Sequence, residues 1–462
     1  MPNIIAYTSL IAWPLVMLFL LNRFGTSRGI LLCLLIAYLI LPAGFDIDFP
    51  LIPALNKYTL TSLVLLIYLL LTKQPTGYRE LKGWHKFVFL MLMISPFLTS
   101  ITNQERYHFI QGLSLYDGLS QSGIGFLSFF PFLLGLAYFN THERQIMLLR
   151  FVAIAAVLYS VLVLYEIRMS PQLHASLYGY FPHSFLQQYR EGGFRAVVFL
   201  GHGLVVAMFM VVGFACIFAL HKAKVRAWRF DNRLLLLVLF VTIVLQKSYG
   251  AMLYALLAVA MLGFFSPRKI HLVTIGIAAI FLTYPVTSSM GIFPHQQIIN
   301  VASSLSAERA QSLSFRFEQE DVLLQHALKK PAFGWGSWGR NRVYDPETGA
   351  DLSVTDGYWV IALGTGGWLG FIALFYFVLM AIYLSYKNQR YMHEKHEQYL
   401  MAAHSLIVAL ILINQMPNAS LHPLYWLIIG SLFSRALMFA DSKKQVLNGK
   451  IQPKHSVANS NY

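Results

Sequence analysis

The chain has 462 residues, enough for two or three soluble domains, but its composition excludes a soluble protein. Hydrophobic residues make up 57% and charged residues 12%, whereas a soluble domain has about 25% charged residues to hydrate its surface. The net charge of +15 is better explained by cytoplasmic loops of a membrane protein, in which Lys and Arg collect, than by nucleic-acid binding. The two cysteines, Cys33 and Cys216, are too few for a disulfide framework or a Cys-rich zinc site. We therefore expect a polytopic membrane protein.

Several apolar runs approach the ~20 residues that a helix needs to cross about 30 Å of hydrocarbon. They are continuous, whereas strands of a membrane barrel alternate polar and apolar residues. The sequence therefore predicts an all-α polytopic bundle of about 12–14 transmembrane helices. The first run has no basic residue before it, which favours a retained helix over a cleaved signal peptide. The runs fall at 4–21, 29–41, 59–72, 87–101, 123–139, 146–165, 196–220, 234–246, 250–265, 270–289, 366–386, 398–415 and 422–440.

Basic residues are distributed unevenly between the two sets of loops. With the C-terminal tail inside, the inner loops and Arg435 hold 23 of the 35 Lys and Arg residues but 6 of the 20 acidic residues. This asymmetry predicts the topology, because cytoplasmic loops carry an excess of Lys and Arg. The expected organisation is a transmembrane bundle (1–289), one large outer loop region that contains helices (290–356), C-terminal transmembrane helices (357–440) and a disordered cytoplasmic tail (441–462).

Ionisable residues stand at the outer ends of predicted helices, where a charge needs a partner or a function. Arg195 opens one predicted helix, and His202 lies two turns into it between two glycines. A snorkelling arginine and an interhelical histidine are the alternative interpretations. Arg316 lies near the start of a second predicted helix, from about Ser314 to Lys330, whose charged face could also be simply solvated.

A third segment begins at Asp356, which stands at the start of a membrane helix. An N-cap role would explain this acid cheaply, because Asp accepts a hydrogen bond from the first turn of a helix. A functional carboxylate is the other interpretation, so the residue alone leaves both open.

The three segments, in this order, resemble the O-antigen ligase and polysaccharide polymerase superfamily, whose members look like C-type glycosyltransferases that use lipid-linked sugars. The family has an Arg, a Gly and a His/Asn-Pro pair, matched loosely by Arg195, Gly201 and His202-Gly203. It then has an Arg on a helix that ends in Pro-x-x-Gly-x-Gly, matched by Arg316 and 331–336. The resemblance covers roughly 190–435.

The last part of the family pattern shows the main departures. It reads His-Asn-x-Tyr-Leu followed by Gly-x-x-Gly, and counting back from Gly367 and Gly370 places Asp356 at the His position. Tyr249 stands where the family has Arg in a Ser-Arg-Gly turn, and Gly203 stands where Pro is usual. Asp at the His position indicates a carboxylate variant of the family.

The resemblance implies an enzyme of the bacterial inner membrane with its active site facing the periplasm. Such enzymes move an oligosaccharide from undecaprenyl diphosphate to a sugar hydroxyl. The diphosphate leaving group requires fixed cations, and the guanidinium of arginine binds phosphate oxygens bidentately. We therefore expect Arg195 and Arg316 to bind the diphosphate with help from Lys247 and Arg309, and Asp356 to act as the base.

Further binding residues are expected around this site. His202 is a candidate substrate ligand, and four aromatic residues offer faces for sugar rings or, alternatively, form an interfacial aromatic belt. They are Trp335, Trp338, Tyr358 and Trp359. No cofactor or metal is predicted, although Asp46 and Asp48 form a weak alternative metal or catalytic site.

The favoured function is a polysaccharide polymerase that joins undecaprenyl-diphosphate-linked repeat units during exopolysaccharide or O-antigen synthesis. The alternative is an O-antigen ligase that transfers the glycan to lipid A core. A second alternative is a lipid-linked-oligosaccharide flippase, although transporters place their charges at the bilayer midplane and often show repeats. The implied partners are the lipid-linked oligosaccharide and membrane lipids, with a chain-length regulator left open and nucleic acid excluded.

Overall fold

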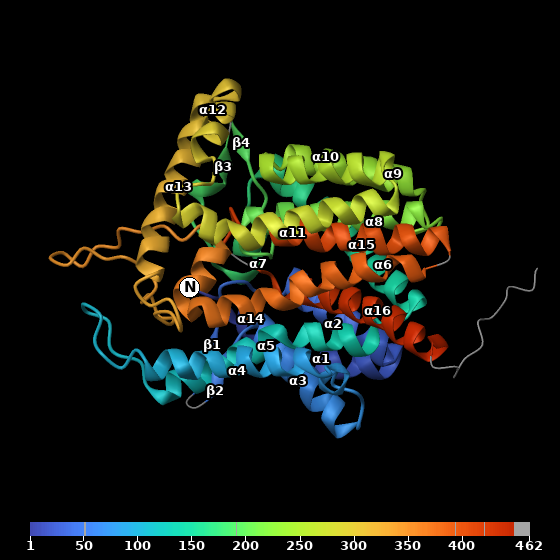
Figure 1. Cartoon of the computed structure of the whole chain (residues 1–462), viewed down its shortest axis with the longest axis horizontal. Coiled ribbons are helices and arrows are strands. Elements are labelled where there is room, and N and C mark those ends of the chain that lie inside the picture. The colour runs from blue at the N-terminus through green and yellow to red at the C-terminus, as the bar shows by residue number, and fades with distance from the viewer. Residues whose placement is uncertain (50–51, 191, 393, 420, 448–462) are drawn as a thin grey trace, which may run out of the picture.

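The computed structural model describes residues 1–49, 52–190, 192–392, 394–419 and 421–447. This part of the chain is largely helical, with strands only in two short hairpins (Figure 1). Eight helices are long and apolar enough to cross a membrane, and five more apolar helices are shorter. Each of the predicted runs overlaps one of them, which confirms an all-α polytopic membrane protein.

The bounds of these helices differ from the predicted runs mainly at their outer ends. The long helices are α1 (Ile4–Phe24), α4 (Trp84–Ile101), α5 (Leu115–Tyr138), α6 (His142–Met169), α8 (Gly203–Lys222), α11 (Pro267–Ser289), α14 (Tyr358–Asn388) and α15 (Lys395–Ile413). The shorter ones are α2 (Thr26–Ile40), α3 (Lys57–Leu71), α9 (Asn232–Leu245), α10 (Tyr249–Phe264) and α16 (Pro423–Leu447).

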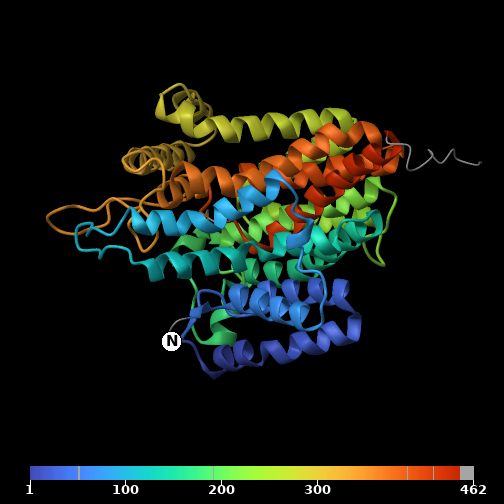
Figure 2. The same ribbon diagram turned by 60° about the horizontal axis from the view of Figure 1, so that its bottom comes forward.

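The loops that were predicted to lie outside gather at one end of the bundle, which we call the outer end (Figure 1). There Asn3 donates its backbone N–H to Tyr178 (2.9 Å), and Lys330 pairs with Glu105. Helices α1, α2 and α3 form a layer along one side of the remaining helices (Figure 2). The alternation of the chain between two ends therefore agrees with the predicted topology.

The outer end carries the remaining short elements. Helices α12 (His295–Leu305) and α13 (Ala307–Ala327) belong to the large loop, and α13 runs across the ends of the membrane helices (Figure 1). The loop thus contains helices, as predicted, but α13 starts before Ser314 and places Arg316 near its middle. The other elements are β1 (Ile47–Phe49), β2 (Ile52–Leu55), α7 (Leu173–Tyr178), β3 (Tyr189–Arg190), β4 (Gly193–Phe194) and the 3-10 turns Tyr78–Glu80, Leu186–Gln188 and Gln389–Tyr391.

The prediction that Arg195 opens a helix is wrong, because α8 begins only at Gly203. The segment before it is buried and forms a turn in which Val198 has a φ of 45°, and Glu166 at the end of α6 accepts hydrogen bonds from the N–H groups of Val197 and Val198 (both 2.8 Å). A buried backbone must satisfy its polar groups, and here a carboxylate supplies the acceptor that a helix would otherwise provide. His202 is therefore the residue that caps α8, its Nδ1 accepting from the N–H of Leu204 (3.1 Å).

Helix α14 is broken at Gly367, whose φ of 60° and ψ of −166° are not helical. The Gly/Trp turn after α13 docks at this break through backbone hydrogen bonds. The N–H of Trp335 donates to Gly364 (2.8 Å), and the N–H of Trp368 donates to Pro331 (2.7 Å). The two glycine motifs of the sequence therefore meet each other in the fold.

The end of the chain differs from the predicted tail. Helix α16 continues to Leu447, so residues 441–447 are helical where the sequence predicts disorder. The rest of that tail, 448–462, lies outside the described residues.

Candidate functional site

Arg316 and Asp356 form an ion pair at the outer end. The Nε of Arg316 lies 3.6 Å from the Oδ2 of Asp356, and its Nη1 donates a hydrogen bond to the carbonyl of Pro417 (2.9 Å). The two side chains are 31% and 38% exposed, so both can meet a ligand from outside. Because of these contacts, α13, the entry to α14 and the loop between α15 and α16 converge on one guanidinium.

The N-cap interpretation of Asp356 is wrong. Gly357 holds the cap position of α14, and no side chain there accepts a hydrogen bond from the first turn. The carboxylate of Asp356 forms an ion pair with Arg316 instead, which joins the start of α14 to α13. A functional role for Asp356 stays a prediction.

Glu320 is the residue that sequence reasoning missed. It follows Arg316 by one helical turn on the same face of α13, and its Oε1 is buried with no hydrogen-bond partner among the described residues. Burial raises the pKa of Glu320 to about 7, against the lowering effect of the nearby Tyr284 hydroxyl and Trp359 indole. The signal that could have identified Glu320 from the sequence is its i, i+4 spacing from Arg316, which places the two residues on the same face of a helix.

A small cavity lies between these side chains. Arg316, Glu320, Asp356 and the main chain around Pro417 line it, and its volume is about 10 Å³. A cavity of roughly 10–15 Å³ holds one water molecule, so the two carboxylates and the guanidinium enclose a space of about that size.

Arg195, Lys247 and Arg309 form a second group of cations. The Nη2 of Arg195 donates to the carbonyl of Lys247 (3.2 Å), and the Arg309 guanidinium lies over the ring of Tyr249. The stem of Arg195 occupies the space that a Cβ at Gly203 would need, which explains why glycine stands there.

The structure joins this group to Arg316 through α13. Arg309 and Arg316 are seven residues apart on that helix, which corresponds to two turns or about 10 Å. Arg309 and Arg316 therefore lie along α13, and Arg195 contacts Lys247, which stands two residues before the Tyr249 ring under Arg309. His202 lies nearby as the cap of α8, its ring 4.6 Å from that of His183 between centroids.

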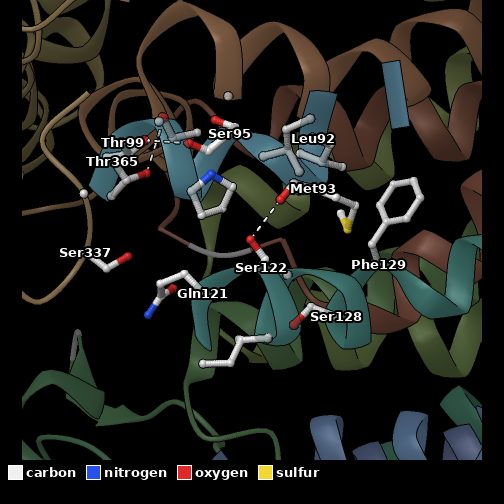
Figure 3. Close-up of a pocket in the computed structure, with 18 of the residues that line it drawn as sticks. Leu92, Met93, Ser95, Thr99, Gln121, Ser122, Ser128, Phe129, Ser337 and Thr365 are labelled. Atoms are coloured by element: carbon white, nitrogen blue, oxygen red, sulfur yellow. Dashed lines mark hydrogen bonds between the residues drawn. The ribbon is translucent and has the colours of Figure 1, made fainter. Parts of the chain in front are cut away.

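A larger cavity lies elsewhere, on the side of α14 that faces α4, α5 and α16 (Figure 3). Its volume is about 420 Å³, and we call it the hydroxyl groove. The described residues that line it include no Lys or Arg, and their only acid is Asp117, which forms a capping box with the N-cap Ser114 of α5. Its polar side chains include Ser95, Thr99, Gln121, Ser128, Ser337 and Thr365.

The hydroxyl groove contains two of the four predicted sugar-binding aromatics. Trp338 is 60% exposed and Tyr358 lies on the first turn of α14, and both line the groove. Trp359 is 1% exposed and packs edge-on against Tyr284, so it has no face for a sugar and that prediction is wrong. Trp335 stacks on His326 with ring centroids 4.3 Å apart and donates from Nε1 to the His326 carbonyl (2.8 Å). One face of Trp335 is thus already covered.

The alternative acidic site lies apart from these residues. Asp46 accepts a hydrogen bond from the side chain of Asn56 (2.9 Å) just before β1, and Asp48 lies within that strand. In the described ranges, no three or more His, Cys, Asp or Glu side chains form a group that could hold a metal ion.

No protein-family model matches the chain, and no curated protein matches it significantly. The fold and its sites define a multi-pass helical membrane protein whose outer end carries a cation–carboxylate site and, across the first turns of α14, a groove lined by hydroxyl and apolar side chains without a cation among the described residues.

Proposed function

We propose that this protein is an inverting glycosyltransferase that polymerises undecaprenyl-diphosphate-linked repeat units on the periplasmic side of the bacterial inner membrane. The observation that carries the proposal is the Arg316–Asp356 pair at the outer end of the bundle, on a helix that also carries Arg309. A lipid-linked diphosphate would lie at this height, where the membrane meets water. Cations at the outer end of the bundle, away from the midplane, favour such an enzyme over a transporter.

In the proposed reaction, a hydroxyl oxygen of the acceptor sugar attacks the anomeric carbon of the donor. The bond from that carbon to the diphosphate breaks, and the diphosphate leaves with the electron pair. Arg316, which pairs with Asp356 in the absence of substrate, would bind the departing oxygens, with Arg195 and Lys247 as further cations. Fixed cations stabilise the charge that develops on a leaving group. The acceptor proton passes to a carboxylate beside Arg316.

The hydroxyl groove supports this assignment. Hydroxyl and amide groups together with the exposed ring of Trp338 suit a sugar, which presents both hydroxyls and apolar faces. A diphosphate would not fit there, because the lining residues described for the groove include no cation. We assign the neutral glycan to the groove and the diphosphate to the cations on the other side of the first turns of α14.

The proposal can be tested with purified protein in lipid nanodiscs and a synthetic undecaprenyl-diphosphate-linked repeat unit. The wild type should give a ladder of polymers, and Arg316→Ala or Arg195→Ala should lower its rate by roughly 100-fold or more. Lysine at either position should restore only part of the rate, because its ammonium cannot bind bidentately.

Arg342→Ala is the matched control for these variants. Arg342 is another outer cation, but it pairs with Asp351 and Thr355 within its own loop, so its loss should leave the rate nearly unchanged. Polymer at the wild-type rate from both Arg316→Ala and Arg195→Ala would contradict the proposal. Transfer to lipid A core in place of a ladder would identify the ligase instead.

A further inference from the structure

We propose that Glu320, rather than Asp356, is the group that finally takes the proton of the acceptor hydroxyl, which it reaches through one water molecule in the cavity beside Arg316. This assignment rests on the proposed glycosyltransferase function and specifies the base within it.

The two carboxylates that line the cavity differ in their surroundings. Asp356 is 38% exposed and already paired with Arg316, so its negative charge is compensated. Glu320 makes no ion pair within the described part of the chain, and its buried Oε1 has no hydrogen-bond partner there. Burial without a compensating charge makes a carboxylate bind a proton more readily. The geometry therefore favours Glu320 as the proton acceptor.

Other groups that face Glu320 come from four segments. On its own helix, Arg316 lies one turn before it and Asp321 follows it, the latter exposed and accepting from Gln325. Tyr284 of α11 and Trp359 of α14 approach its carboxyl, and Asp356 precedes α14 across the cavity. Burial, with a smaller contribution from Asp321, raises the pKa of Glu320 to about 7 against the lowering effect of Tyr284 and Trp359, and this is the range in which a general base works best near neutral pH.

A path for the proton leads away from Glu320. The hydroxyl of Tyr284 lies 3.2 Å from Nε2 of His295 on α12, and the His295 ring is only partly buried. Burial lowers the pKa of His295, although Asp321 opposes this, which favours the neutral ring. Tyr284 therefore lies between the Glu320 carboxyl and the partly exposed His295 ring.

The proposed step balances in atoms and charge. The acceptor oxygen forms a bond to the anomeric carbon, and the bond from that carbon to the diphosphate oxygen breaks with its electron pair going to the diphosphate. The hydroxyl proton moves to the water in the cavity while that water gives a proton to the Glu320 carboxylate. Glu320 becomes a neutral acid, which a buried site tolerates better than the anion.

The experiment compares three variants of α13 in the nanodisc polymerisation assay between pH 5 and pH 9. In the wild type, kcat/KM should rise about tenfold per pH unit up to about pH 7 and then level off, because the base must be ionised. Glu320→Gln should lower kcat/KM at pH 8 by roughly 100-fold or more and remove this rise with pH. Glu320→Asp should keep part of the rate with a shifted profile.

Glu318→Gln is the matched control, because Glu318 is an exposed carboxylate on the same helix that bonds to Ser314. It should keep both the rate and the pH profile. If Glu320→Gln behaves like Glu318→Gln while the wild type makes polymer, the assignment of Glu320 is overturned and the proposed function stands. A wild type that makes no product from any lipid-linked donor overturns the proposed function and the assignment together.

Discussion

Gly334 and Gly367 are in direct contact, although they belong to separate motifs. A Cβ at Gly334 would lie 2.5 Å from the backbone nitrogen of Gly367, and both glycines have positive φ angles of 71° and 60°. The turn that follows α13 therefore packs against the break in α14. This contact helps to hold α13, which carries Arg316, beside the start of α14, where Asp356 lies. Gly334 and Gly367 therefore have a structural role, because a side chain at either position would collide with the backbone of the other segment.

Gly334→Ala should therefore destabilise the outer end. The added methyl group collides with backbone, and the left-handed conformation alone costs about 1–2 kcal/mol for a residue with a Cβ. We expect a lower midpoint of thermal unfolding in detergent than for Gly291→Ala. Gly291 has a similar φ of 67° but open space around it, so equal effects of the two substitutions would show that only the backbone angle matters.

Asp356→Asn separates pairing from proton transfer. Asn cannot form the ion pair with Arg316, so we expect polymerisation to fall by about 10-fold or more because the guanidinium loses its orientation. The rise of kcat/KM towards pH 7 should remain, because Glu320 is still present. Loss of that rise in Asp356→Asn, with its retention in Glu320→Gln, would return the role of base to Asp356.

The stability of the protein should depend on pH through Glu320. Its pKa in the fold is raised from 4.5 to about 7, so the unfolded chain loses this proton first and folding stability falls as pH rises through that window. Glu320→Gln should therefore be more stable than the wild type at pH 8, by roughly 1–3 kcal/mol, and equal to it below pH 4. Thermal unfolding of both proteins at the two pH values measures this difference in stability. The same difference between wild type and Glu320→Gln at both pH values would argue against a raised pKa of Glu320.

Trp338→Ala should weaken glycan binding in the hydroxyl groove. An exposed indole offers a flat face to a sugar, whereas Trp359 is buried and serves packing. We expect KM for the lipid-linked repeat unit to rise several-fold with the fold intact, while Trp359→Ala lowers stability by about 3–5 kcal/mol. Unchanged KM in Trp338→Ala would remove this ring from the glycan site.

Chelation should leave polymerisation intact, because Arg195, Lys247, Arg309 and Arg316 supply the positive charge that the diphosphate requires. The rate of the purified enzyme in EDTA measures this. If EDTA abolishes the activity and magnesium or manganese restores it, Asp46 and Asp48 become the leading site.

The sequence by itself determined the class of the protein and the positions of its apolar helices. Length and continuity of the apolar runs are local properties, so these helices could be read without contacts. The sides of the loops, which the distribution of Lys and Arg indicates, stay a prediction. Two of the predicted cations, Arg309 and Arg316, lie on α13, and a third, Arg195, contacts the fourth, Lys247.

Only the tertiary structure decided how these residues meet. The late start of α8 depends on Glu166, which lies about thirty residues earlier in the chain and replaces the helical hydrogen bonds of Val197 and Val198. The pairing of Arg316 with Asp356 depends on the path of the loop between α13 and α14. The burial of Glu320 depends on two other helices, α11 with Tyr284 and α14 with Trp359. Burial and pairing set the free energy of a charge through neighbours in space, and a linear pattern does not contain those neighbours.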